Sequence, residues 1–330
     1  MKDILNDLFE YKTLSKERAK EVLTNISRGA YNTSQVASFL TVYVLRSITV
    51  NELAGFRDAL LELCLPVDLS SFETVDLCGT GGDSKNTFNI STVSAFVVAG
   101  SGVKVAKHGN YGVSSIYGSS NVLEHLGTKF TNSQDKLQHQ LEKAGICLMH
   151  APLFHPAMKQ VAPIRKELGI KTFFNMLGPL VNPSRPQSQL VGVFSLELAR
   201  LYSYFFQTTN AKFKIVHTLG GYDEVSLTDD FKLIDNQGER MISPDNVGFQ
   251  KTNESELYGG ESVADAAKIF IEVLENRATS AQRAVVLTNS ALAIQCAKPD
   301  LDFAAALEQA RHSLESGNAF SCFKKFISLQ

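Results

Sequence analysis

Hydrophobic and polar positions follow two different patterns along this chain of 330 residues. Over residues 1–72, apolar side chains recur at helical spacing, as in Val36, Phe39 and Leu40, and no stretch shows the two-residue period of a strand. From residue 73 onward, short apolar runs alternate with longer helical patterns, which is typical of an α/β domain. The pattern therefore predicts a small all-helical domain over 1–72 and a larger α/β domain over 73–330.

Capping residues predict where the N-terminal helices begin. We expect Ser15 to cap one helix and Ser34 the next. Thr49 and Glu52 have the spacing of a capping box, in which each residue bonds the backbone N–H of the other. Pro66 marks the exit from this helical region.

The α/β region contains apolar runs short enough to be strands, separated by helical patterns. The first expected strand ends near Val75 and Leu77, and further strands are expected at 103–106, 146–149, 190–194, 213–217, 231–235 and 241–242. Helices are expected at 196–206, 266–274, 281–297, 303–314 and 320–327.

A glycine-rich loop follows the first expected strand. Gly79, Gly81 and Gly82 allow a sharp turn and a close approach to a ligand, because glycine has no Cβ. The apolar run 93–99 then predicts a helix beginning near Ser91 and Thr92, whose free N–H groups and positive dipole end face the loop. Helix ends of this kind bind phosphate.

Neither of two familiar phosphate motifs fits the loop. The nucleotide P-loop needs lysine after its last glycine, where this chain has Asp83, and the dinucleotide motif needs a third glycine, where it has Ser84. An ordinary strand–helix turn is the alternative to a phosphate cradle. Asp83 would repel phosphate unless a cation or ribose hydroxyls also sit there.

Two further polar segments follow expected strands, where open α/β sheets bind ligands. Lys107, His108 and Asn110 lie among glycines, and the alternative to a ligand loop there is a polar surface loop. Asp223 and Glu224 follow two glycines and could hold Mg²⁺ with substrate phosphates, or form a solvated acidic turn. The apolar segment 150–158 contains two histidines and two prolines. It could form the wall of a pocket for a flat organic ligand, or its histidines could serve only packing or capping.

Charge and composition narrow the class of protein. The net charge of −2 gives no support to a nucleic-acid partner, and no apolar run approaches the length of a membrane span. The five cysteines form no Cys-x-x-Cys pair, which argues against a zinc or disulfide framework and favours a reducing, cytoplasmic environment.

The ordered set of motifs resembles the anthranilate phosphoribosyltransferase family over nearly the whole chain. The segments that carry the resemblance are Gly79-Thr80-Gly81-Gly82-Asp83, Asn89-Ile90-Ser91-Thr92, Lys107-His108-Gly109-Asn110, Val113-Ser114-Ser115, Gly118-Ser119, Val122-Leu123-Glu124, His155-Pro156-Ala157-Met158, Val161-Ala162-Pro163-Ile164-Arg165 and the run 174–183. The resemblance implies a nucleoside phosphorylase/phosphoribosyltransferase-like fold, with the helical domain completed by residues 165–187 and the active site in the cleft between the domains. It also implies transfer of phosphoribose from phosphoribosyl pyrophosphate to anthranilate in tryptophan biosynthesis, with Mg²⁺, by a homodimer.

The resemblance also implies a role for individual residues. Phosphoribosyl pyrophosphate would contact Gly79, Gly82, Asp83, Thr87, Asn89, Ile90, Ser91, Thr92, Lys107, Ser115 and Ser119. Anthranilate would contact Gly79, Asn110, His155 and Arg165, the last through its carboxylate, and Mg²⁺ would be held by Ser91, Asp223 and Glu224. Lys107 and His108 are the catalytic candidates, for charge stabilisation and as an optional base. Tyr111 departs from the family, which commonly has arginine there, so one cationic contact is in doubt.

Two other functions compete with this interpretation. A pyrimidine nucleoside phosphorylase has a similar fold and a Lys-His-Gly loop, but would need neither the Asp223–Glu224 pair nor the run 174–183. A non-enzymatic, nucleic-acid-binding relative of the family should be basic over one face, which the net charge of −2 disfavours.

Overall fold

The computed structural model describes residues 1–112 and 117–330. The chain forms two compact units, one of residues 1–67 with 151–183 and the other of residues 68–150 with 184–330. The chain thus returns to the helical unit at residue 151 and leaves it after residue 183, whereas the sequence predicted the returning segment at 165–187. Strand β3 (Ile146–His150) ends at His150 and helix α8 (Ala151–Phe154) begins at the next residue, so no linker separates them.

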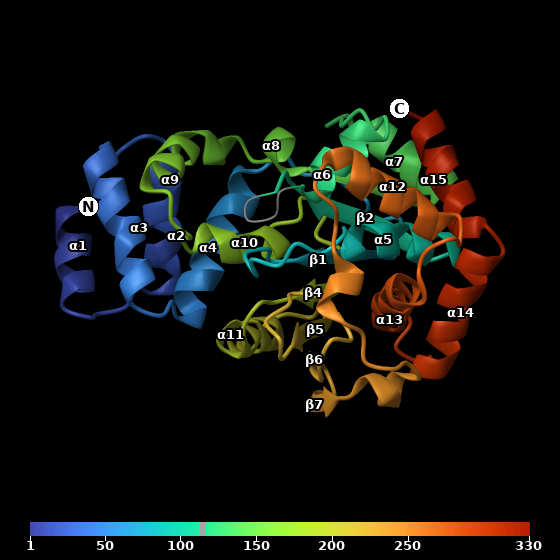
Figure 1. Cartoon of the computed structure of the whole chain (residues 1–330). Helices are drawn as coiled ribbons and strands as arrows, with labels where there is room; N and C mark the ends of the chain where they lie inside the picture. The colour runs from blue at the N-terminus through green and yellow to red at the C-terminus, as the bar shows by residue number, and fades with distance from the viewer. Residues whose placement is uncertain (113–116) are drawn as a thin grey trace. The chain divides into compact units, whose positions relative to one another are not determined.

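The helical unit is built from an N-terminal segment and a returning segment, drawn in blue and in green in Figure 1. The first segment contains α1 (Lys2–Phe9), α2 (Lys16–Ser27), α3 (Thr33–Leu45) and α4 (Val50–Leu63). The second contains α8, η1 (Pro156–Gln160), α9 (Ala162–Leu168), α10 (Phe174–Leu177) and η2 (Gly178–Leu180). Aromatic rings join the two segments, since Phe56 of α4 stacks on Phe173 at a centroid distance of 4.4 Å.

Of the three helix caps predicted for this unit, two are present and one is not. Ser15 caps α2, and Thr49 with Glu52 forms the predicted capping box of α4. The prediction for Ser34 is wrong, because Asn32 caps α3 and Gln35 completes its capping box. The position three residues after Ser34 is alanine, which has no side-chain oxygen to complete such a box.

The α/β unit is organised around one sheet. Its strands are β1 (Thr74–Gly79), β2 (Lys104–Gly109), β3, β4 (Ser188–Gly192), β5 (Lys212–Thr218), β6 (Phe231–Asp235) and β7 (Gly238–Ile242). Within the described residues the order is β3-β2-β1-β4-β5-β6-β7. The pairs β5–β6 and β6–β7 are antiparallel, and the other neighbouring pairs are parallel. A strand is present near each predicted position, but not every bound agrees. Strand β2 continues through Lys107 and His108, which the sequence placed in the loop after a strand ending at 106, and β4 ends at Gly192 and not at residue 194.

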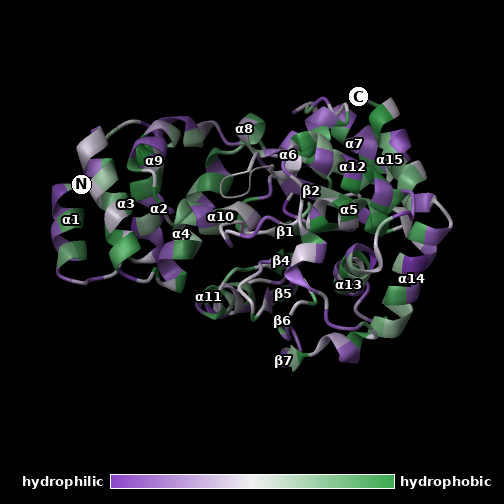
Figure 2. Cartoon of the chain, in the orientation of Figure 1, coloured by the Kyte–Doolittle hydropathy of each residue, from purple (hydrophilic) through white to green (hydrophobic). Residues whose placement is uncertain are grey.

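Helices cover the sheet and supply most of the core. They are α5 (Ile90–Gly100), α6 (Ser119–His125), α7 (Gln134–Ala144), α11 (Leu196–Gln207), α12 (Val263–Leu274), α13 (Ser280–Ala297), α14 (Phe303–Glu315) and α15 (Asn318–Ser328), with short turns η3 (Pro244–Val247) and η4 (Glu254–Leu257). Residues 90–99 of α5 are almost all buried, because α13, α14 and α15 pack against this helix. By contrast, α1 and α14 carry both hydrophobic and hydrophilic residues along their length (Figure 2). Among the described residues, no helix is long and apolar enough to cross a membrane.

The strand order places a ligand crevice at the carboxyl ends of β1 and β4. From β1 the chain runs outward through β2 and β3, and then returns to the other side of β1 as β4 and β5. Ligands in open α/β sheets bind where the order reverses in this way. The parallel register pairs Gly79, the last residue of β1, with Gly192, the last residue of β4.

Candidate active site

The acidic turn after β5 rests on the two glycines that end β1 and β4. A Cβ on Gly79 would lie 2.2 Å from Asp223 Oδ2, and one on Gly192 would lie 1.5 Å from the Asp223 carbonyl oxygen. Neither distance is compatible with a side chain, so both positions require glycine. The sequence assigned Gly79 to close approach by a ligand, whereas in this structure Gly79 leaves room for Asp223.

Backbone N–H groups of the glycine loop and of α5 hold both carboxylates of that turn. Gly81 and Gly82 adopt left-handed backbone conformations, with φ of 65° and 85°. The Gly81 N–H donates to Asp223 Oδ2 at 2.6 Å, and the Ser91 N–H donates to Glu224 Oε1 at 2.9 Å. The predicted phosphate loop and the predicted metal ligands, far apart in sequence, therefore meet in one place.

Helix α5 begins at Ile90, one residue before the predicted start. Its N-cap residue, Asn89, makes no capping bond and instead donates from Nδ2 to the Tyr117 carbonyl at 3.1 Å. Ile90 and Thr92 are buried in the first turn. Ahead of the helix, Thr87 forms an antiparallel bridge with Tyr258, which ties the loop to the chain after η4.

Negative charge accumulates at the acidic turn. The pKa of Asp223 is raised well above its usual value. Burial is the largest cause, and repulsion from Asp83 and Glu224 adds to it. Desolvation is also the largest cause for Glu224, whose pKa is raised to about 7 although the Ser91 N–H acts in the opposite direction. Carboxylates crowded together in this way favour a cation nearby.

This donor set suits Mg²⁺ better than a cation whose ligands must all come from the protein. Among the described residues there is no group of three or more His, Cys, Asp or Glu side chains that could hold a metal by themselves. Magnesium usually takes only one or two carboxylates and completes its octahedron with waters and substrate phosphates. Asp223 and Glu224 next to a phosphate-type loop provide that arrangement.

The two catalytic candidates, Lys107 and His108, lie on β2 and are both buried. Lys107 Nζ donates to the Leu77 carbonyl of β1, and its charge lowers the pKa of Glu224 in part. The backbone N–H of His108 donates to Asp76 Oδ1 at 3.2 Å. The ammonium group therefore lies close to the acidic turn, while the roles of both side chains stay predictions.

The loop after β2 is packed on the first turn of α6. Ser119 Oγ donates to the Asn110 carbonyl at 3.1 Å, and a Cβ on Gly118 would lie 2.0 Å from the Gly112 nitrogen. Asn110 and Ser119, predicted to contact different substrates, are thus brought together. The third predicted residue of this region, Ser115, lies outside the described residues.

The helical unit holds a half-buried guanidinium that has no acidic partner among the described residues. Arg165 of α9 donates from Nη2 to Asn175 Oδ1 at 3.2 Å, and its guanidinium carbon lies 5.3 Å from the centre of the Phe174 ring. Arg165 Nε has no hydrogen-bond partner in the described part of the chain. Burial lowers the pKa of Arg165. A half-buried guanidinium without a carboxylate partner is suited to bind an anion.

His155, the other predicted acceptor residue of this unit, is 5% exposed. Burial lowers its pKa to about 4, although the backbone carbonyls of Val181 and Leu60 favour the protonated ring. The imidazole is therefore neutral at physiological pH. Its neighbours are backbone groups of α4 and of the returning segment.

Sequence reasoning missed residues that support the acidic turn. Asn289 of α13 accepts from the Val225 N–H at 3.2 Å and donates to the Val225 carbonyl at 2.8 Å, which fixes the chain just after Glu224. The run 281–297 was interpreted as core only. A buried asparagine inside an apolar helix was the available signal, because a buried amide needs partners.

Comparison with known proteins gives one consistent result. A family model described as "Glycosyl transferase family, a/b domain" matches residues 71–320, and one described as "Glycosyl transferase family, helical bundle domain" matches residues 2–64. An anthranilate phosphoribosyltransferase of Cytophaga hutchinsonii is 59% identical over 327 residues, covering 99% of this chain and 100% of the relative.

Solved structures agree with the sequence relatives. The crystal structure of anthranilate phosphoribosyltransferase from Thermus thermophilus matches with a TM-score of 0.92 and 30% identity, covering 98% of each chain. The Saccharomyces cerevisiae enzyme in complex with PRPP and Mg matches with a TM-score of 0.91 and 27% identity, covering 98% of this chain and 96% of the other.

Proposed function

Because the chain belongs to the anthranilate phosphoribosyltransferase family, we propose how its own residues divide the work of the family's reaction. The enzyme transfers the phosphoribosyl group of 5-phosphoribosyl 1-pyrophosphate to the amine of anthranilate, giving N-(5-phosphoribosyl)anthranilate and pyrophosphate, in tryptophan biosynthesis. One observation carries the proposal for the site: the glycine loop and the acidic turn are hydrogen-bonded to each other at the switch point of the sheet.

Phosphoribosyl pyrophosphate would bind at the loop between β1 and α5. The left-handed conformations of Gly81 and Gly82 and the N-terminus of α5 present backbone N–H groups suited to phosphate oxygens. The residues proposed for this substrate are Gly79, Gly82, Asp83, Thr87, Asn89, Ile90, Ser91, Thr92, Lys107 and Ser119, with Ser115 outside the described part. Lys107 would add a buried positive charge.

Asp223 and Glu224 would hold Mg²⁺, with Ser91 beside them. The proposal is supported by their raised pKa values, since crowded carboxylates gain most from a divalent cation. When bound, the ion supplies positive charge that offsets the charge of the pyrophosphate group. The yeast relative was solved with PRPP and Mg, which is consistent with this assignment.

Anthranilate would bind through its carboxylate to Arg165. The planar guanidinium matches a planar carboxylate with two parallel hydrogen bonds, and lysine could not reproduce that geometry. Asn175 and the Phe174 ring hold the guanidinium in place. Gly79, Asn110 and His155 are proposed as further acceptor contacts.

In the reaction, the bond between the anomeric carbon and the pyrophosphate oxygen breaks while the amine nitrogen bonds to that carbon. Pyrophosphate leaves with the bonding electron pair, and the nitrogen loses a proton. The protein mainly has to position two substrates and stabilise the departing anion. Because the amine of anthranilate is unprotonated at neutral pH, a strong base is not needed, and His108 is proposed only as a proton acceptor.

The decisive assay mixes the protein with phosphoribosyl pyrophosphate, Mg²⁺ and anthranilate and follows the loss of anthranilate fluorescence. We expect turnover that stops with excess chelator and returns when Mg²⁺ is added back. Full activity in chelator would remove the metal role of Asp223 and Glu224. Phosphorolysis of thymidine or uridine without loss of anthranilate would favour the phosphorylase, and tight retention on heparin without turnover would favour the nucleic-acid-binding relative.

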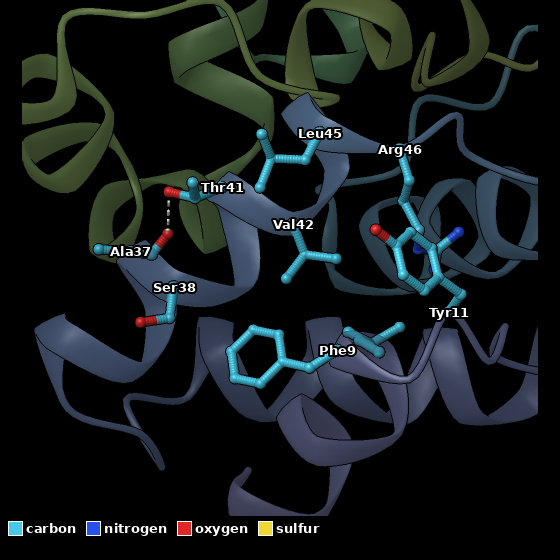
Figure 3. A pocket seen from close by; sticks show the side chains of 9 residues that line it. Phe9, Tyr11, Ala37, Ser38, Thr41, Val42, Leu45 and Arg46 are labelled. Atoms are coloured by element: carbon cyan, nitrogen blue, oxygen red, sulfur yellow. Dashed lines mark hydrogen bonds between the residues drawn. The ribbon is translucent and has the colours of Figure 1, made fainter.

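We also propose that the enzyme is a cytoplasmic homodimer, in line with its free cysteines and its family. In the helical unit, α1 and α3 border an apolar groove of ≈ 440 Å³ (Figure 3). Phe9, Tyr11 and Leu45 beside it are 59%, 83% and 83% exposed, an apolar surface that a second copy would cover. Leu45→Asp should shift the light-scattering mass to that of a monomer, whereas Tyr204→Asp, at an exposed position of α11, should not. An unchanged mass for both variants would place the interface elsewhere.

A further inference from the structure

Tyr111, the residue that departs from the family pattern, is held by two specific contacts. Its ring meets His150 edge to face, with centroids 4.6 Å apart and planes at 74°. Its hydroxyl donates to Glu124 Oε1 of α6 at 2.9 Å. The residue is 40% exposed, so these contacts, rather than burial, keep it in place.

His150 is fixed on its other sides by groups that do not belong to the loop. Its Nδ1 lies 2.9 Å from Ser120 Oγ in the first turn of α6, and its ring stacks on Phe130 at 4.6 Å and 18°. The residue is 6% exposed and ends β3, directly beside Gly109 of β2 in the parallel register. Tyr111 therefore packs against a rigid platform.

The backbone of the same loop follows α6 at close range. The N–H groups of Gly112 and Gly118 both donate to Asn121 Oδ1, at 3.2 Å and 3.0 Å. The Ser120 N–H donates to the Asn110 carbonyl at 3.2 Å. The loop after β2 is thus anchored to α6 through its backbone and the Tyr111 hydroxyl, and to His150 through the Tyr111 ring.

We propose that the ring contacts of Tyr111 with His150 and of His150 with Phe130 position the segment 107–112, the end of β2 and the start of the following loop, for substrate binding. Tyr111 then acts through this segment and not as a cationic contact to substrate. The inference rests on the proposed function, in which Lys107 near the end of β2 and Asn110 just after it contact the two substrates. A tyrosine side chain carries no positive charge at neutral pH, so residue 111 cannot make a cationic contact to a phosphate or carboxylate. Its ring instead fixes the conformation that places its neighbours.

The test compares Tyr111→Ala and Tyr111→Phe with Tyr204→Ala, which removes an exposed ring from α11 and serves as the control. Steady-state kinetics give kcat and both KM values, and hydrogen exchange reports the amides of residues 108–112 and 117–122. For Tyr111→Ala we expect KM for both substrates to rise about tenfold, the value of one aromatic contact, with faster exchange in both segments. Tyr111→Phe keeps the ring and should stay within about threefold of wild type.

Wild-type KM values and unchanged exchange in Tyr111→Ala would overturn the positioning role. Equal losses in Tyr111→Ala and Tyr111→Phe, with unchanged exchange, would also overturn it, because the hydroxyl would then contact substrate directly. If the wild-type protein does not turn over anthranilate, the proposed function is wrong, but the positioning role of Tyr111 is not yet decided. The exchange experiment, which needs no substrate, would still decide whether these ring contacts order the loop.

Discussion

Glu52 in the helical unit and Glu224 in the α/β unit are both carboxylates drawn away from water, yet their pKa values shift in opposite directions. Glu52 is fully buried and receives hydrogen bonds from the Leu14 N–H at 3.0 Å, the Tyr43 hydroxyl at 3.0 Å and the Thr49 N–H at 2.9 Å, besides its ion pair with Arg46. Burial alone would raise the pKa of Glu52, but Arg46 and the backbone donors lower it below the ordinary value.

Glu224 has a much poorer set of partners. Desolvation is the main cause that raises its pKa to about 7, and repulsion from Asp83 acts in the same direction. The N–H and hydroxyl of Ser91 and the charge of Lys107 offset only part of this shift. The two arginines show the same contrast, since Arg46 is paired with Glu52 whereas Arg165 has no carboxylate among the described residues. Removing one member of a buried, fully partnered charge pair destabilises the fold, whereas a charge drawn away from water without such partners is a candidate ligand site.

The largest expected effect is on activity at the acidic turn. Asp223→Asn or Glu224→Gln should lower kcat/KM on the order of 1,000-fold, because a bound metal contributes several kcal/mol of charge stabilisation. The fluorescence assay measures this loss, and Glu239→Gln, an exposed acid on β7, is the matched control. Retention of wild-type rates by both site variants would mean that the turn is only structural.

Arg165→Ala should raise KM for anthranilate by about 30- to 1,000-fold, the equivalent of about 2–4 kcal/mol for a desolvated charge pair. KM for phosphoribosyl pyrophosphate should change little, and Arg165→Lys should recover only part of the loss. Equal losses for both substrates, or a fall in melting temperature that accounts for the lost activity, would make Arg165 structural.

Glu52→Gln should act on stability and leave the kinetics unchanged. It leaves Arg46 without its carboxylate partner, so the free energy of unfolding should fall by about 3–5 kcal/mol. Tyr43→Phe removes a single hydrogen bond to Glu52 and should cost about 1 kcal/mol. Chemical denaturation measures both, and a stable Glu52→Gln protein would show that the network around Glu52 does not stabilise the unit.

The smallest expected effect is on the pH dependence of stability. The pKa of Glu224 is raised in the folded protein, so in metal-free protein its contribution becomes less favourable as pH rises from its unfolded pKa to about 7. The lowered pKa of Glu52 has the opposite sign, and its stabilisation is lost as pH falls below its unfolded pKa. Melting temperatures measured across pH test both contributions. The loss of stability with rising pH should be weaker in Glu224→Gln, and the loss of stability with falling pH should be weaker in Glu52→Gln. Identical pH profiles for wild type and variants would contradict both assignments.

The sequence predicts those features of the two regions that depend on residues close together along the chain. The capping box of Thr49 and Glu52 follows from residues three positions apart, and the glycine loop follows from its composition. The partners of Asp223 could not be predicted, because Gly81 lies 142 residues away and contact depends on strand order. Gly192 appeared as an ordinary strand residue for the same reason. Arg165 was identified through family resemblance, since one arginine beside a helical apolar face has no distinctive pattern.

Thermal unfolding of Asp223→Asn at pH 8 tests most directly whether the acidic turn is built for a cation. Asparagine can still accept from the Gly81 N–H but removes one of the crowded charges. We expect the metal-free variant to melt at or above the wild-type temperature. Mg²⁺ with phosphoribosyl pyrophosphate should raise the melting temperature of wild type but not of the variant. A metal-free variant less stable than wild type that is still fully stabilised by these ligands would contradict the account.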